Sequence, residues 1–457
     1  MEVCMQKKIR LYYNSVERDM SVFLKYFFEM VGIYVHEELT DIDHQHLLDQ
    51  LNTICKKRFP NNTFHDVQSN IEYDANIFYV TSEDGLKNIS DSEKNIVIAN
   101  RNLSNDTIVY SENNLEFLML ILDCFLKKNI ITKDEYNQLT MCAQIYYSNK
   151  YWELILRGNL FFRVPSAYED TLKLYQKLFD NLCNCLKTNG VWFTDSNLEY
   201  VQYAALRVTC DMGQYQHKYR KPVSQRIDDT VFQLLQENSH FDCLRDSIDL
   251  LIADYYRLAG ELINYALDYY RNVACVAYNQ NGCFRLGRLY DSIGSAGLQS
   301  IDRHQYYLEA TRNFAMSIER QCTDFRSWSW LGSCLSQMGD VQGAYNAYGI
   351  TTNILHNRFY NHVISPLETD YLFRAYNYRA FVINKFFNRY SEAIKENYCA
   401  IDTYWTTETS SFYHLLGDEQ DIYRNIVRSN LNLDKIYYEI SKLKEKINQK
   451  NMKYQSN

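Results

Sequence analysis

Helix-breaking residues are scarce in this chain, which holds only 4 prolines and 15 glycines among 457 residues. Antiparallel sandwiches and barrels need many turns, and turns depend on these two residues, so the scarcity argues against a mostly β fold. An apolar fraction of 46% allows a full core. The sequence therefore predicts a mostly helical protein of two or three domains, or one domain followed by a repeat array.

An excess of basic residues is also missing, since the net charge is -8. This balance argues against a surface dedicated to nucleic acid, although a local basic patch is still compatible with it. The most basic stretch runs from His217 to Lys221. With Arg226 it holds five basic residues beside a proline. It could bind an anionic ligand, but such a segment is more typical of a solvated loop.

Paired cysteines are absent, because the 13 cysteines are scattered and none forms a C-x-x-C motif. Disulfide frameworks and zinc sites need paired spacing, so we expect free thiols in a reducing compartment and no metal site. Asp41, Asp43, His44 and His46 alternate in a loop and do not share one face. With no signal peptide and no run long enough to span a membrane, the expected location is cytoplasmic.

Short apolar runs and helical patterns alternate along the first 110 residues. A helix with Val16, Phe23 and Phe27 on its apolar side follows the first run and ends at Gly32, and a second helix is expected over His46–Lys57. Such alternation predicts a parallel sheet in a small α/β domain over residues 1–112. The expected strands are 8–13, 33–38, 76–80, 95–100 and 107–110.

The opening pattern is a strand, the loop NSVERD, an amphipathic helix, a glycine and a second strand. It resembles the start of a TIR (Toll/interleukin-1 receptor) domain over about residues 8 to 40, and in outline as far as about residue 126. The resemblance implies a flavodoxin-like domain used for association. It makes Asn14, Ser15 and Arg18 after the first strand, and Ser82 after the third, candidate ligand-binding residues.

Enzymatic TIR domains cleave NAD with a glutamate in a motif like W-C-x-x-E after the third strand. This chain has TSEDGLKNISDSEKN there, without Trp or Cys, so Glu93 or Glu83 would have to serve. This departure favours a non-catalytic domain without a cofactor. The alternative is an NAD glycohydrolase for which NAD is only the substrate.

The stretch from Asp324 to Thr352 has the clearest pattern in the second part of the chain. Two helices separated by Gly339-Asp340 are expected, with large and small residues at helical spacing. The order W-x-x-L-G, a turn, then A-x-x-x-aromatic resembles a tetratricopeptide repeat. The residues that carry it, and the packing roles it implies, are Trp328, Leu331, Gly332, Ala344 and Tyr348.

Neighbouring segments match the same unit less closely. Gly287 takes the position of Gly332, with an enlarged inner turn after it, and Ala393 takes the position of Ala344. We expect an irregular helical region over 113–230, in which Thr132 caps a helix that runs to about Ser148, and a helix over 198–210 leads into a polar connection over 212–223. Repeats are expected over 231–433, and an amphipathic capping helix and tail over 434–457. The concave face of such an α-solenoid binds a protein or peptide partner, and no catalytic motif was found in the helical part. The sequence thus predicts a binding and signalling scaffold.

Overall fold

The computed structural model describes residues 6–14, 18–80, 87, 89, 92–99, 107–109, 114–149, 151, 168–188, 199–218, 244–259, 263–296, 300–361, 364–406 and 433–455. These residues form two compact units that do not follow the order of the chain. The first unit comprises residues 1–41 and 69–282, and the second comprises residues 42–68 and 283–457. Each unit is described below by itself.

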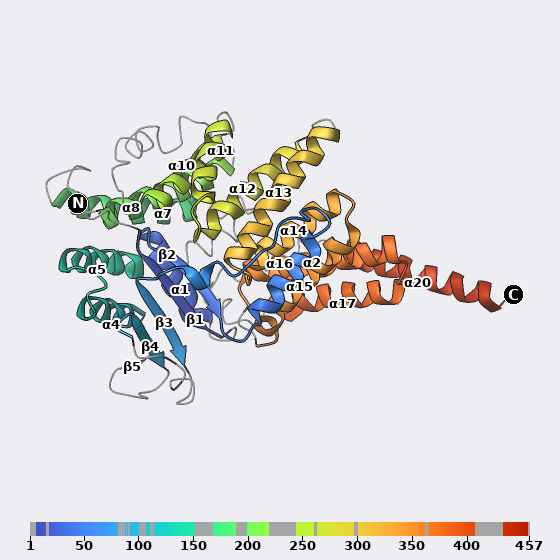
Figure 1. Cartoon of the computed structure of the whole chain (residues 1–457), viewed down its shortest axis with the longest axis horizontal. Helices are drawn as coiled ribbons and strands as arrows, with labels where there is room; N and C mark the ends of the chain where they lie inside the picture. Colours follow the sequence, from blue (N-terminus) through green and yellow to red (C-terminus); the bar gives the residue numbers. More distant parts are fainter. Residues whose placement is uncertain are drawn as a thin grey trace. The chain divides into compact units, whose positions relative to one another are not determined.

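A parallel sheet with strand order β2-β1-β3-β4-β5 forms the first unit's centre (Figure 1). This order is that of flavodoxin-like folds, and each strand lies within about two residues of its expected position. Alternate residues are buried, as the pattern in the first strand shows for Ile9, Leu11 and Tyr13. The strands are β1 (Lys8–Tyr13), β2 (Tyr34–Leu39), β3 (Ala75–Val80), β4 (Asn95–Ala99) and β5 (Thr107–Val109).

Helices α1 (Arg18–Met30) and α4 (Asn114–Lys127) pack on the strands of this sheet and on each other. The rings of Phe28 and Phe125 stack at 5.8 Å between centroids. The expected glycine end of the first helix is confirmed, since Gly32 has a φ of 86°. A Cβ at Gly32 would lie 2.9 Å from Leu244, so a larger residue would be both strained and crowded there.

Further helices extend the first unit beyond the sheet. The expected cap at Thr132 is confirmed as a capping box, in which Thr132 and Glu135 exchange side-chain to backbone hydrogen bonds. The helix expected to end near Cys210 runs on to Lys218, so part of the predicted polar connection is helical. These helices are α5 (Lys133–Ser148), α7 (Tyr168–Thr188), α8 (Glu199–Lys218), α10 (Arg245–Ala259) and α11 (Ile263–Ala274).

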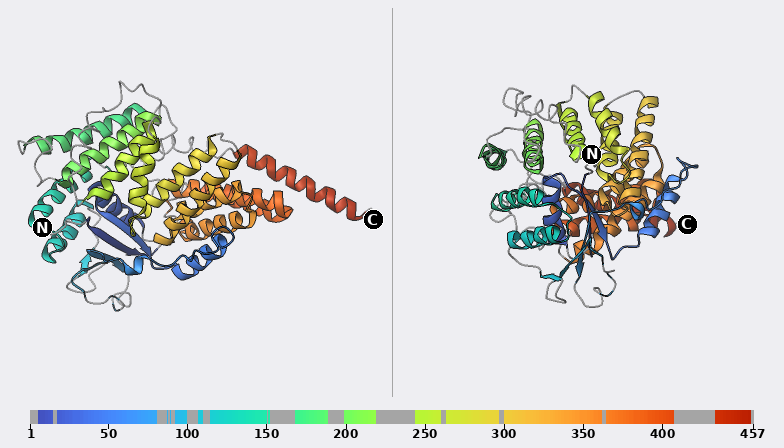
Figure 2. Two further views of the ribbon diagram at one scale, coloured as in Figure 1. Left: turned by 45° about the horizontal axis from the view of Figure 1, so that its top comes forward. Right: turned by 60° about the vertical axis from the view of Figure 1, so that its left-hand side comes forward.

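The second unit is a run of paired helices (Figure 2). Each of the pairs α14–α15 and α16–α17 packs internally, and each neighbours the next. The break expected at Gly339 is confirmed, with a φ of 77°. The helices are α12 (Gln280–Ser295), α13 (Ser300–Arg320), α14 (Phe325–Gln337), α15 (Val341–Tyr360), α16 (Pro366–Val382), α17 (Tyr390–Thr406) and α20 (Leu433–Gln455), and α16 continues into a π-helical turn, Ile383–Phe387.

The prediction of an enlarged inner turn after Gly287 is wrong. Helix α12 continues to Ser295 and α13 begins at Ser300, so most of the extra residues lengthen the two helices. The last turn of α12 packs on α13, since Gly294 faces the Tyr307 ring and Ser295 Oγ lies 3.2 Å from the Tyr307 hydroxyl. Such contacts stabilise longer helices more than a longer loop would.

Helix α2 (His44–Cys55) belongs to the second unit although it lies between β2 and β3 in the chain. It packs on α13 and α15, and Arg58 just after it donates to the Met338 carbonyl at 3.2 Å. Its buried residues are Leu47, Leu48, Leu51, Ile54 and Cys55. The sheet's second crossover is therefore made by a helix that stabilises the array.

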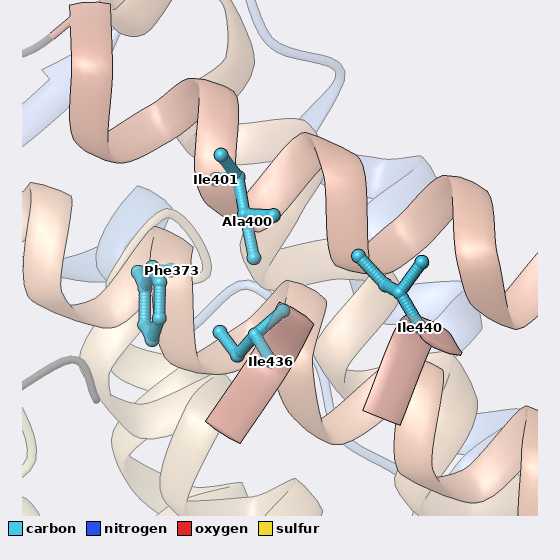
Figure 3. Packing of buried hydrophobic residues seen from close by; sticks show 5 residues of the cluster. All are labelled: Phe373, Ala400, Ile401, Ile436 and Ile440. Atoms are coloured by element: carbon cyan, nitrogen blue, oxygen red, sulfur yellow. The ribbon is translucent and has the colours of Figure 1, made fainter. Parts of the chain in front are cut away.

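Helix α20 covers the end of the array. Ile436 and Ile440 pack into a cluster with Phe373, Ala400 and Ile401 (Figure 3). All of these side chains are buried, so the helix shields apolar surface that the last pair would otherwise expose. The amphipathic stripe expected here is thus the face that packs on α17.

Candidate functional site

The order of the strands reverses between β1 and β3, and in open α/β sheets ligands bind outside the carboxyl ends of the strands at such a point. Tyr12 and Phe78 are register partners there, one or two residues before their strands end. Their rings stack at 4.3 Å with an interplanar angle of 6°. This edge is the first candidate site.

The predicted ligand-binding residues are only partly described. Asn14 follows β1 directly and is half-buried at this carboxyl edge, and Arg18 begins α1. Ser15, Ser82 and Glu83 lie outside the described residues. Both Ser82 and Glu83 follow β3 in the chain. Since β3 pairs with β1 in parallel, the carboxyl ends of these two strands lie side by side.

Glu93 lies at the other edge of the sheet. It is exposed in a turn just before β4 begins at Asn95. Since β1, β3 and β4 are parallel, the amino end of β4 is opposite the carboxyl edge that carries Asn14. Five residues of strand separate the two edges by roughly 16 Å. The structure therefore does not bring Glu93 and Asn14 together.

Polar and aromatic side chains surround the stacked pair on the same face of the sheet. The Arg10 guanidinium lies 4.2 Å from the centroid of the Tyr73 ring, and His36 Nε2 lies 2.9 Å from Glu38 Oε2. Burial raises the pKa of Tyr73 to about 12, so its hydroxyl stays protonated at neutral pH. A neutral phenol beside a guanidinium suits recognition better than acid–base catalysis.

A buried carboxylate on the opposite face has a structural role. Glu37 accepts a hydrogen bond from the Tyr13 hydroxyl at 2.5 Å and pairs with Lys25 of α1. A carboxylate held by two donors at a strand–helix contact stabilises that contact, and truncating one partner would leave a buried charge.

The second candidate site is a strip of side chains on α12, α14 and α16. The Arg288 guanidinium lies 3.7 Å from the centroid of the Trp330 ring, and Trp330 Nε1 donates to the Tyr371 hydroxyl at 3.1 Å. The strip thus joins the first helices of consecutive pairs. We call it the aromatic–arginine strip, and its residues, all half-buried, are Phe284, Arg288, Arg326, Trp330, Tyr371 and Arg374.

Two arginines of the strip are paired with carboxylates. Arg326 pairs with the buried Asp324 at 2.7 Å and lies 4.8 Å from the Phe284 ring centroid. Arg374 pairs with Asp370 at 3.0 Å. Ordered guanidinium groups beside aromatic rings lose little entropy when they bind, which favours recognition of a partner.

The residues assigned to repeat packing lie in the core beside this strip. Trp328, Leu331 and Ala344 have no exposed surface. The Trp328 indole donates to the Cys322 carbonyl at 2.7 Å. Gly332 faces Tyr348 and Gly287 faces Phe314, and Ala393 is buried with Ile383 and Leu443.

The strip itself was missed by the sequence reasoning. Trp330 lies two residues after the buried Trp328, so it faces away from the core. Tyr371, Arg374 and Tyr378 recur at helical spacing on α16. Aromatic residues on the polar side of a repeat helix are the signal that could have identified the strip.

No metal centre forms among the residues described here, since no three His, Cys, Asp or Glu side chains gather suitably. The loop expected for residues 41–46 is partly helical, since His44 and His46 lie in the first turn of α2 and Asp43 caps this helix by accepting from the His46 amide. None of the described helices combines the length and the hydropathy that a membrane-spanning segment needs. Comparison with known protein families and with curated proteins finds no match to this chain.

Proposed function

We propose that the chain is a binding scaffold of tetratricopeptide-repeat type, in which the array holds a segment of a partner protein on the aromatic–arginine strip. The observation that carries this proposal is the linkage of Arg288, Trp330 and Tyr371 across three successive first helices. An extended peptide laid across these helices would meet rings and guanidinium groups at each step. Trp, Tyr and Arg are the residues most enriched at binding hot spots.

The test begins with selection of peptides from a random displayed library on the full chain. A selected peptide should bind Trp330→Ala and Arg374→Gln at least about tenfold more weakly, because each change removes a hot-spot contact. Arg303→Gln, an exposed change on α13, is the matched control and should bind normally. If the selected peptides bound the parent and all of these variants equally well, the strip would not be the peptide-binding site.

The α/β unit is proposed to mediate association, as its TIR-like opening implies. Supporting this, Leu120 on α4 is 41% exposed and Tyr147 on α5 is 39% exposed, and these two helices pack together. Leu120→Glu should shift the mass measured by light scattering toward the monomer. The exposed change Met452→Glu on α20 should not, and a parent protein that is monomeric at all concentrations would contradict association.

An NAD glycohydrolase is the second candidate, favoured by the strand reversal that places the ends of β1 and β3 together. Glu83 follows β3, whereas Glu93 lies at the opposite edge of the sheet. Under this proposal Glu83→Ala abolishes NAD loss and Glu93→Ala leaves it unchanged. Absence of NAD turnover by the full chain under all conditions tried would dispose of it.

A further inference from the structure

Lysines and aromatic rings gather at the C-terminal end of the second unit, away from the strip residues. The residues of this basic aromatic patch come from the end of α16, the π-helical turn, the first half of α17 and the middle of α20. Its cations are Lys385, Arg389, Lys442, Lys444 and Lys446, and its rings are Phe381, Phe386, Tyr390, Tyr398 and Tyr438.

Contacts between three elements make the patch continuous. Lys446 of α20 lies 5.2 Å from the centroid of the Tyr390 ring and donates to Asn384 Oδ1 at 3.4 Å. Lys444 donates to the Tyr398 hydroxyl at 3.2 Å. Lys446 therefore links α20 to the π-helical turn and to the start of α17, and Lys444 links α20 to a later turn of α17.

The π-helical turn shapes this surface. Residues Ile383–Phe387 follow α16 in π geometry, and Asn388 ends the turn in the left-handed region with a φ of 53°. Isolated π turns are uncommon and occur often at functional sites. Here the turn brings Phe386 near Phe381, with Lys385 5.2 and 5.3 Å from the two ring centroids.

The rings of the patch remain open to solvent. Phe381 is 49% exposed, Phe386 45%, Tyr398 40% and Tyr438 58%. Cation–π pairs exposed to solvent are individually weak. The lysine side chains can therefore leave the rings and pair with anionic groups of a partner, and apolar side chains of the partner can then cover the rings.

The charges on the patch favour one kind of occupant. Cations outnumber carboxylates, but Glu392 pairs with Arg389 at 3.4 Å, and Glu439 and Glu445 lie near Lys442. Phosphates of a nucleic acid would all be negative and would face these carboxylates. A peptide can place acidic side chains on the lysines and its backbone N–H groups on the carboxylates.

We propose that this patch is a second interaction surface, which binds an acidic protein segment in which carboxylates alternate with apolar or aromatic residues. The whole chain carries a net charge of -8, so such a segment is repelled by most of the protein and attracted here. This surface is independent of the aromatic–arginine strip.

The experiment measures fluorescence anisotropy of a labelled dodecapeptide in which glutamate alternates with tyrosine, titrated with the full chain. Comparison probes are the peptide with lysine in place of glutamate and an oligo(dT) of matched length. We expect the acidic peptide to bind, and high salt to weaken its binding. The triple change K385Q/K444Q/K446Q should raise its Kd by about tenfold or more.

A matched triple change elsewhere controls for net charge. K57Q/K127Q/K177Q removes three exposed lysines outside the patch, and it should leave the Kd unchanged. Equal weakening in both triple variants would show only a net-charge effect and overturn the proposal. So would no binding of the acidic peptide by the parent, equal binding of the lysine peptide, or tighter binding of oligo(dT) that the patch variant abolishes. If the strip variants bound the selected peptides as tightly as the parent does, the strip proposal would fail, but the binding of the acidic peptide to the patch would still stand.

Discussion

Two glycines set how closely the paired helices of the array approach each other. A Cβ at Gly332 would lie 3.0 Å from the Tyr348 ring, and one at Gly287 would lie 2.9 Å from the Phe314 ring. Gly349 on α15 has open space around its missing Cβ. The same substitution should therefore have opposite effects at Gly332 and at Gly349.

Gly332→Ala should lower the free energy of unfolding by roughly 1–3 kcal/mol, because the added methyl group crowds a packed ring. Gly349→Ala should raise it by about 0.5–1 kcal/mol, since alanine favours a helix wherever it fits. Urea unfolding followed by circular dichroism measures both. A stabilised Gly332→Ala would mean that the two helices are farther apart than described.

A buried acid makes the array sensitive to pH. Burial raises the pKa of Asp291, although the Cys334 thiol and Arg288 oppose the shift. The folded chain thus holds this proton more tightly than the unfolded chain does. Its contribution to stability is complete below the ordinary carboxyl pKa of about 3.8, and is lost as the pH rises through the higher folded value.

Asp291→Asn should remove this part of the pH dependence. Between about pH 4 and 7 the variant should lose less unfolding free energy than the parent does. Thermal unfolding across that range measures the difference, with the exposed Asp302→Asn as control. Parallel pH profiles for the parent and Asp291→Asn would contradict a raised pKa.

Residue-level prediction succeeded where a side chain is held by a local pattern. The cap at Thr132 and the left-handed glycines Gly32 and Gly339 follow from neighbours within a few residues. Trp330 and Tyr371 are 41 residues apart. No local pattern couples such residues, because only the stacking of successive helix pairs brings them together.

Helices and strands were the most predictable level of this molecule. Short apolar runs between polar loops identified all the strands in the described sheet. The helical stripes located α1 within about two residues and the start of α20 within one, and the cap signal at Thr132 located α5. Burial of alternate or every third to fourth residue leaves a periodic record in the sequence. Helix length was less predictable, since longer helices replaced the inner turn expected after α12.

The cap α20 permits a direct test at this level. Ile440 is 3% exposed in the end cluster, so Ile440→Ala should cost about 2–5 kcal/mol. Met452 on the same helix is 63% exposed, and Met452→Ala should change stability by less than about 0.5 kcal/mol. Differential scanning calorimetry compares the two, and equal melting temperatures would mean that α20 does not shield the array.

At the scale of the whole molecule, the chain passes between its two units more than once. It leaves the first unit after Asp41, returns at Ser69, and leaves again after Gly282. The packing partners of α2 lie hundreds of residues away in the chain, and nothing in its amphipathic pattern indicates which surface it covers. This kind of long-range pairing is the part of the fold that local sequence patterns could not predict.

Leu51 has no exposed surface within α2, so Leu51→Ala should loosen the array rather than the sheet. Hydrogen exchange should lose protection in α13 and α15, while β2 and β3, which flank α2 in the chain, stay protected. Leu24→Ala in α1 is the converse control and should affect β1 and β2. Lost protection confined to the strands would place α2 with the sheet.

The position of α2 also bears on how the chain folds during synthesis. This helix ends at Cys55, whereas its partner α15 ends at Tyr360. At 5–20 residues per second, roughly 300 further residues take about 15–60 s to be translated. For that interval Leu47, Leu51 and Ile54 have no array to cover them. A nascent chain of this protein therefore exposes the apolar face of α2 to solvent and to other chains until roughly 300 further residues have been translated.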